Sequence, residues 1–190
     1  MRDRAITLKF DLPGGQDRLK QMVLYVSKKC ETAKRFGGIK LNKILWKSDF
    51  DAYAARGIPV TGRAYQRLRL GPAPKEMVPV RREMVGLGMI RIDQVDFGDD
   101  IVEHRTMALI EPDLANFAEG DLAYVESAIG YYWHMTGMET SDDSHGPAWM
   151  TRSDQEPMPY ESALLSDRRP QTPQMARIKK LIFDRGLISE

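Results

Sequence analysis

The sequence of 190 residues contains a single cysteine, Cys30, so no disulfide can form within the chain. Disulfides are rare in reducing compartments, and one lone thiol fits a protein of the cytoplasm. No apolar run approaches the roughly 18 residues that a membrane-spanning helix needs. The first ten residues, MRDRAITLKF, have no apolar secretion signal. We therefore expect a soluble, cytoplasmic protein with no membrane partner.

Motifs for catalysis and metal binding are also missing. The chain has no G-x-S-x-G nucleophile elbow, no phosphate-binding P-loop and no G-x-G-x-x-G dinucleotide fingerprint. The histidines His104, His134 and His145 are never four residues apart, and no cysteine pair accompanies them. A structural or catalytic metal site needs such a set of ligands. We therefore predict a protein that is not an enzyme and that holds no metal and no cofactor.

Charge is distributed unevenly along the chain. Residues 1–91 carry 20 Lys and Arg against 8 Asp and Glu, and residues 92–167 carry 2 against 17. These two parts have net charges of +12 and −15, although the whole chain has a net charge of +1. The two parts can pair with each other inside the fold, or they can present a basic and an acidic face to partners.

Apolar residues recur at helical spacing in several segments and alternate with polar residues in others. The second helical segment, 41–56, is apolar on two sides, so we expect it to be central and buried. Two β-segments flank DFGDD, which predicts a hairpin. The expected helices cover about residues 16–34, 41–56, 73–87, 120–137 and 173–185, and the expected strands cover about 58–70, 89–95 and 101–109.

This order of segments predicts an α+β fold, a mostly helical single domain with a small antiparallel sheet that includes the β-hairpin. The first half follows the order of a winged helix, in which the third helix reads DNA and the hairpin is the wing. We expect a core domain over residues 1–150. A C-terminal extension over 151–190, mostly irregular up to about residue 173, would end in a helix packed on or near the core.

The stretch Gly71-Pro72-Ala73-Pro74 interrupts the alternating pattern that precedes it. Glycine frees the backbone, while the two prolines fix their own φ and disfavour helix in the residues before them. We therefore expect the strand to end here and the third helix to leave at a fixed angle. Gly71, Pro72 and Pro74 are predicted to be structural.

DNA binding is one reading of the basic first half. In a winged helix, Lys75, Arg81 and Arg82 of the third helix would face phosphates or base edges. The predicted wing has an acidic tip, DFGDD, which would repel phosphate. The acidic tip argues against DNA binding, and a winged-helix transcriptional regulator stays the alternative function.

The stretch from Asp142 to Trp149 leaves its own alternatives open. Asp142, Asp143 and His145 fit a proton-transfer cluster, although a capped turn or brief helix with exposed carboxylates is the commoner arrangement. His145 and Trp149 flank Gly146-Pro147 in a polar context. A tryptophan in such a place anchors either a loop or a partner.

Several of these stretches together resemble a known family. KLNKILWKSDFDAYAARGIPVTGRAYQRLRLGPAPKEM, residues 40–77, combines a K-L-x-K helix, an aromatic-rich segment, a G-x-P-V-T-G turn and a strand that ends in G-P-x-P. The stretches EPDL, SHGPAW and PYESALLSD follow at 111–114, 144–149 and 159–167. Over about residues 36–167 the chain is similar to the SocA-like Panacea antitoxin domain family, whose members are also described as phage-associated proteins.

The resemblance implies an antitoxin of a toxin–antitoxin system, which neutralises a cognate toxin by direct protein–protein binding. At least one similar protein is an adaptor that delivers its toxin to a protease, so a protease is a further expected partner. The sequence also leaves a homodimer open. The alternative role of Lys40 and Lys43 is to solvate one edge of their helix. The candidate contact residues, chosen for polar or aromatic placement beside the family-like stretches, are Lys40, Lys43, Arg67, Arg69, Lys75, His145 and Trp149.

Overall fold

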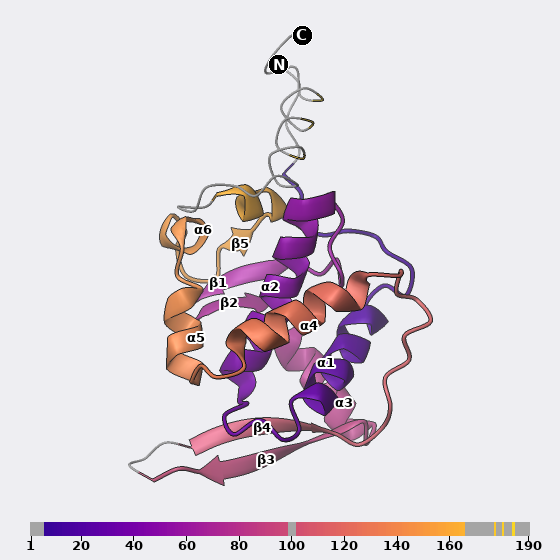
Figure 1. Ribbon diagram of the computed structural model, residues 1–190, viewed down its shortest axis with the longest axis vertical. Helices are drawn as coiled ribbons and strands as arrows, with labels where there is room; N and C mark the ends of the chain where they lie inside the picture. Colours follow the sequence, from indigo (N-terminus) through magenta and orange to yellow (C-terminus); the bar gives the residue numbers. More distant parts are fainter. Residues whose placement is uncertain (1–5, 99–101, 166–176, 178–179, 181–183, 185–190) are drawn as a thin grey trace.

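Figure 1 shows a computed structural model of the chain, in which residues 6–98, 102–165, Arg177, Lys180 and Asp184 are described. Helix α2, Gly38–Arg56, runs through the middle of the molecule. Helices α1 (Asp17–Lys29) and α4 (Asp121–Tyr132) pack against it. The described residues therefore form an α+β fold around one central helix, as predicted.

Helix α2 is buried on both of its apolar sides. One side supplies Leu41, Ile44 and Leu45 to a large apolar cluster shared with α1 and α4. The other side supplies Phe50 and Tyr53 to a smaller aromatic cluster. This confirms the prediction that a helix with two apolar sides lies at the centre.

A small antiparallel sheet lies along α2. Its strands are β1 (Tyr65–Leu68), β2 (Gly71–Pro74) and β5 (Pro157–Met158), in the order β2-β1-β5. The predicted single strand therefore ends at Leu68, and the chain turns back to form a second strand. The strand thus ends before Gly71, as predicted, but the expectation that a helix follows directly is wrong, because Gly71–Pro74 forms a strand of its own.

The ladder explains how a strand can contain two prolines. The Lys75 N–H donates to the Ala64 carbonyl oxygen at 2.8 Å, just beyond the end of β2. Bonded and non-bonded pairs alternate along an antiparallel ladder, so Ala73 is bonded to β1 while Pro72 and Pro74 are not. Their nitrogens point away from β1. A proline on an edge strand costs no ladder hydrogen bond at such positions.

Helix α3, Met77–Gly86, follows β2 and begins later than predicted because β2 takes up the preceding residues. Pro79 lies in its first turn, where backbone N–H groups have no partner within the helix. Strands β3 (Ile90–Asp96) and β4 (Val102–Ala108) then form the predicted hairpin. The first half thus resembles the predicted winged-helix order, with β2 as an additional strand before α3.

The later elements are short. Helix α5 (Gly137–Asp143) begins with a capping box between Thr136 and Glu139, which confirms the brief capped helix predicted there. Helix α6 covers Pro147–Met150, and a 3₁₀ helix, η1, covers Tyr160–Leu164. Helices α1 and α4 end earlier than predicted, because the chain turns after α1 and enters the α5 cap soon after α4.

Residues beyond 150 complete the aromatic cluster. The ring of Tyr160 is fully buried, with its centre 5.1 Å from that of Phe50 and 5.5 Å from that of Tyr53. Residues 157–164, expected to be irregular, thus add a strand and a core side chain. The predicted final helix at 173–185 lies outside the described residues, apart from Arg177, Lys180 and Asp184, and the division at residue 150 stays a prediction.

Candidate functional site

Lys43, a candidate contact residue, is enclosed between α2 and the edge of the sheet. Only 2% of the residue is exposed, and its Nζ donates to the Pro72 carbonyl oxygen at 2.9 Å. That carbonyl lies on the side of β2 that faces away from β1, so Lys43 satisfies an acceptor that the sheet leaves open. Burial lowers the pKa of the Lys43 ammonium to about 7.

Gly71 makes this close approach feasible. Its φ of +94° lies in the left-handed region, which side chains rarely adopt. A Cβ at this position would overlap the Ser144 hydroxyl and the Lys43 side chain. Gly71, Pro72 and Pro74 are all buried, so they shape the scaffold from inside.

Lys40 is buried as well, one turn earlier on α2. It is 2% exposed, and its Nζ donates to the Trp133 carbonyl oxygen at 3.4 Å. Burial is the main cause that lowers its pKa. Lys40 and Lys43 therefore neither solvate a helix edge nor lie on the surface of the folded chain, and we leave both out of the contact surface proposed below.

Three other candidates meet at the end of β1. The imidazole of His145 stacks on the Trp149 ring with centres 3.8 Å apart, and the Arg67 guanidinium lies 4.1 Å from the centre of that ring. The Trp149 Nε1–H donates to the Leu68 carbonyl oxygen at 2.9 Å, and Arg67 forms an ion pair with Asp154. The tryptophan thus anchors the α6 segment to the sheet. Burial lowers the pKa of His145, and Arg67 and Lys43 act in the same direction.

The remaining two candidates, Arg69 and Lys75, are exposed. Arg69 lies in the turn between β1 and β2, and Lys75 lies between β2 and α3. Neither forms an ion pair with any residue that the structure describes. These two cations are therefore available to a partner.

Arg81 and Arg82, proposed as DNA-reading residues, point in different directions. Arg82 is exposed. The Arg81 Nη2 donates to the Thr106 Oγ1 of β4 at 2.9 Å, so this side chain holds α3 to the hairpin. Burial lowers the pKa of Arg81. The structure thus commits Arg81 to an internal contact.

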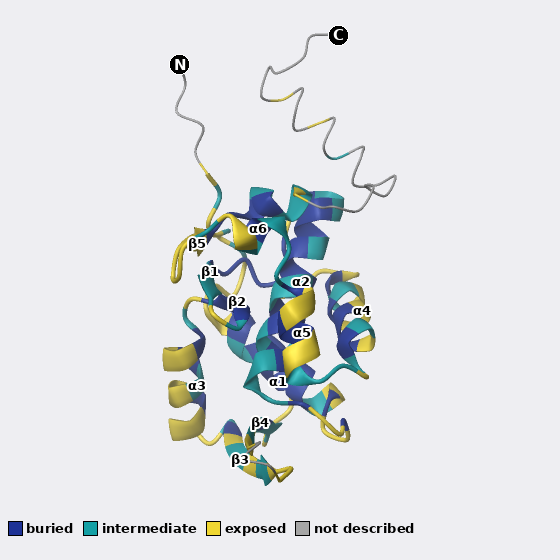
Figure 2. Cartoon of the chain, turned by 90° about the vertical axis from the view of Figure 1, so that its left-hand side faces the viewer, coloured by how far each residue is buried: buried dark blue, intermediate teal, exposed yellow. Residues whose placement is uncertain are grey.

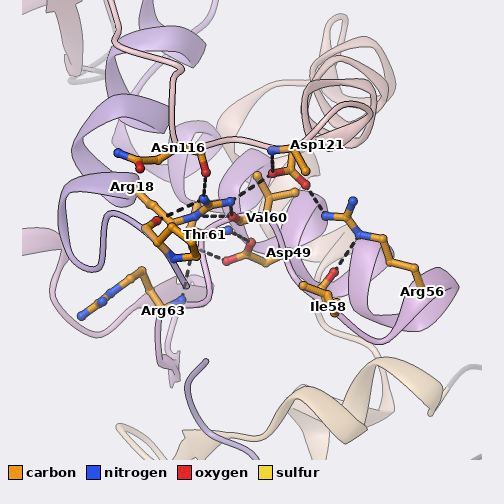
Figure 3. A network of polar contacts seen from close by, with 11 residues as sticks. Arg18, Asp49, Arg56, Ile58, Val60, Thr61, Arg63, Asn116 and Asp121 are labelled. Atoms are coloured by element: carbon orange, nitrogen blue, oxygen red, sulfur yellow. Dashed lines mark hydrogen bonds and ion pairs between the residues drawn. The ribbon is translucent and has the colours of Figure 1, made fainter. Parts of the chain in front are cut away.

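A buried polar network joins distant parts of the chain, and sequence reasoning missed it (Figure 3). Arg18 of α1 donates to the Val60 carbonyl oxygen at 2.9 Å and to Asp121 at 3.0 Å, and it also bonds the Asn116 carbonyl oxygen. Asp121 pairs in addition with Arg56. Asp121 thus connects helices α1, α2 and α4.

Asp49 is the second centre of this network. Its carboxylate accepts hydrogen bonds from the Thr61 N–H at 2.5 Å, from the Thr61 hydroxyl, and from Tyr65 at 2.9 Å. Burial raises the pKa of Asp49, while these hydrogen bonds oppose the rise. A carboxylate on a helix with two apolar sides, followed by a G-x-P-V-T-G turn, is the sequence signal that could have found it.

Much of the chain that carries these features matches a known protein family. Residues 41–150, more than half of the chain, match the family described as antitoxin SocA-like, Panacea domain. The chain belongs to this antitoxin domain family. No curated protein and no solved structure matches the chain.

The matched range of the Panacea domain runs from α2 to α6, so it contains Asp49, Lys43 and Gly71 with most of their contacts, while Tyr160, which also contacts Asp49, lies beyond it. The expected resemblance is thereby confirmed, and so is an antitoxin-type family. No helix in the described part of the chain is long and apolar enough to span a bilayer.

The basic and acidic parts of the Panacea protein pair with each other in the fold. Among the described residues, ion pairs join the range 1–91 to the range 92–167 at six places, which are Arg18–Asp121, Lys28–Glu111, Lys29–Glu126, Arg56–Asp121, Arg67–Asp154 and Arg91–Asp93. Much of the charge segregation therefore serves internal pairing, which was one of the two alternatives.

The Asp142–His145 stretch serves the fold. Asp143 accepts hydrogen bonds from the hydroxyls of Tyr131 and Tyr132, at 2.7 and 3.1 Å, which ties α5 to α4. The Ser144 hydroxyl donates to the Ser141 carbonyl oxygen at 2.6 Å. Among the described residues, no three His, Cys, Asp or Glu side chains are grouped so that they could hold a metal ion.

Proposed function

We propose that this protein is an antitoxin that neutralises a cognate protein toxin by binding it directly and covering its active or substrate surface. The observation that carries the proposal is the match of residues 41–150 to the SocA-like Panacea antitoxin domain. This range includes most of the central helix, strands β1 and β2, and the β3–β4 hairpin, so the family likeness extends over much of the fold.

The roles of the buried polar groups support binding as the activity. Asp49, Lys43 and Asp121 are each occupied by contacts that hold elements together. Exposed charges remain at Arg69, Lys75 and Arg82. A rigid scaffold that presents unpaired charges is suited to recognise a partner of complementary charge, and such charges also speed association. We place the complex in the cytoplasm.

Co-expression with the product of the adjacent reading frame tests the proposal. We expect that product to arrest growth when it is expressed alone, and this protein to restore growth and to co-purify with it in a defined ratio. A neighbour that is harmless alone, together with the absence of a complex on co-purification, would refute the antitoxin function.

The adaptor role is separated by a second measurement on the same strains. If the antitoxin delivers the toxin to a protease, the half-life of the toxin shortens when the antitoxin is present. If it acts by covering the toxin surface, the toxin accumulates as a stable complex, which is the outcome we expect.

A further inference from the structure

We propose that the outer face of α3 is the docking surface of this protein and that it takes an acidic segment of the partner that also carries apolar side chains. We define the α3 face as Val78, Arg82 and Val85, with Lys75 at its N-terminal end. This inference rests on the antitoxin function proposed above and names the part of the toxin that is bound.

The spacing of these residues places them together. Positions 78, 82 and 85 are four and three residues apart, so the three side chains form one stripe along the helix. Val78 is 69% exposed and Val85 is 46% exposed. Met77, Val80 and Met84 are buried beneath the opposite side. Figure 2 shows α3 at the margin of the molecule with its outer turns exposed.

Val78 and Val85 add little to the stability of the isolated chain. Valine loses side-chain freedom in a helix, so its helix propensity is low. Neither Val78 nor Val85 belongs to the buried apolar clusters, and the short helix already contains Pro79 and Gly86. Apolar side chains exposed side by side, next to polar residues, are typical of interaction surfaces.

The charges of α3 are not balanced. Its acidic neighbours are both occupied, because Glu76 pairs with Arg63 at 2.6 Å and Glu83 pairs with Lys20 at 2.6 Å. Lys75 and Arg82 have no ion pair with any described residue. The positive field of the α3 face is therefore uncompensated, and it fits carboxylates that are delivered together with apolar groups.

A protein segment fits this face better than nucleic acid does. Phosphate backbones are recognised by cations and polar groups, and exposed valines add nothing to such contacts. Arg81, the other arginine of the helix, is committed to Thr106. The adjacent hairpin carries Asp93 and Asp96, which would repel a duplex lying along α3.

The test uses the full chain and the product of the adjacent reading frame, with affinity measured by calorimetry. We expect Arg82→Glu and Val78→Asp each to weaken binding at least tenfold. Matched controls lie elsewhere on the surface: Lys34→Glu changes another exposed lysine, and Val102→Asp changes another valine, 48% exposed. Both controls should bind within twofold of the wild type. Because all four positions are exposed, unchanged thermal midpoints verify folding.

Zero-length carbodiimide coupling tests the acidic character of the partner segment. This reagent joins an amine to a carboxylate in direct contact. We expect a cross-link between Lys75 and an Asp or Glu of the partner, which Lys75→Arg abolishes. Cross-links that involve other lysines of this chain and never Lys75 would overturn the proposal.

The remaining outcomes separate the two proposals. A wild-type complex that both α3 variants form with unchanged affinity leaves the antitoxin function standing and overturns the docking surface. No complex with the wild type refutes the antitoxin function, and the docking surface with it. Binding of the chain's own promoter duplex that is lost in Arg82→Glu and retained in Val78→Asp would identify a nucleic-acid surface and overturn the proposal.

Discussion

Helices α2 and α3 both carry lysine or arginine next to apolar residues, but the fold buries two such cations on α2 and exposes two at α3. On α2, Lys40 and Lys43 are 2% exposed, and both donate to backbone carbonyls. Around α3, Lys75 and Arg82 are exposed and unpaired within the described residues. The same residue types are thus structural on one helix and free on the other, because α2 has apolar neighbours on two sides and α3 on one.

This difference leads to distinct expectations for mutation. A change in the α2 and sheet region should lower stability, because buried groups there have fixed partners. A change on the outer face of α3 should leave stability within about 0.5 kcal/mol, as is usual for surface positions. The following experiments test this difference between the two regions, and those with the larger predicted loss of stability come first.

Removal of the Asp49 carboxylate should cause the largest loss. Asp49→Ala leaves the Thr61 N–H and the hydroxyls of Thr61 and Tyr65 without their buried acceptor. We expect the free energy of unfolding to fall by roughly 3–5 kcal/mol, measured by urea denaturation. The control Asp51→Ala removes a half-exposed carboxylate paired with Lys47 and should cost under about 0.5 kcal/mol. Equal effects of the two substitutions would contradict the central role of Asp49.

Substitution of Gly71 should have the next largest effect. Gly71→Ala places a side chain at a φ of +94° and against Ser144 and Lys43. The strain and overlap together should cost about 2–4 kcal/mol. Gly86→Ala on α3 is the matched control, because a Cβ there has no neighbour within 4 Å. This control should gain up to about 1 kcal/mol from better helix propensity. Destabilisation by both would break the contrast between the two regions.

The buried amine of Lys43 should make stability depend on pH. Its pKa is lowered from 10.5 to about 7 in the folded chain, so between these values the unfolded state binds more protons than the folded state. The free energy of unfolding of the wild type, relative to Lys43→Met, should therefore rise with pH above about 7, by up to about 1.4 kcal/mol per pH unit. Below pH 7 the difference should be constant. A difference that is flat from pH 6 to 9 would show that Lys43 keeps its proton when buried.

The anchor of α6 should have a smaller effect. Trp149→Phe removes the indole N–H that donates to the Leu68 carbonyl oxygen and retains an aromatic ring beside Arg67 and His145. We expect a loss of about 1 kcal/mol, with faster amide exchange in residues 147–158. The comparison variant on α3, Arg82→Ala, should show neither change. A partner affinity that falls together with stability only in Trp149→Phe would move the docking surface from α3 to α6.

The sequence predicted the features that rest on local pattern. The two apolar sides of residues 41–56 predicted a central helix, and DFGDD predicted the β3–β4 hairpin, because periodicity and turn residues act over short distances. The capping box at Thr136 agrees with the predicted short helix for the same reason. The family resemblance was visible because each of its blocks, at 40–77, 111–114, 144–149 and 159–167, is continuous in the sequence.

The features that rest on distant contacts could not be predicted. In the sequence, Lys43 belongs to a polar stripe of its helix. Its acceptor in the structure, the Pro72 carbonyl oxygen, lies 29 residues later in the chain. The sequence pattern predicts that Pro72 and Pro74 end a strand. The structure accommodates them within a strand because β2 lies at the edge of the sheet. Arg18 and Asp121, 103 residues apart, carry no local signal of their pairing.

Tyr160 has a consequence for how the chain acquires its structure during synthesis. Its hydroxyl contacts Asp49, 111 residues earlier, and β5 closes the sheet beside it. The Panacea match ends at residue 150, before either is translated. The aromatic cluster around α2 therefore stays incomplete on the ribosome until residue 160 has emerged, and closing so long a loop is slow. A shortened protein that retains residues up to 165 should fold, whereas one cut at 150 should expose Phe50 and Tyr65 and depend on chaperones.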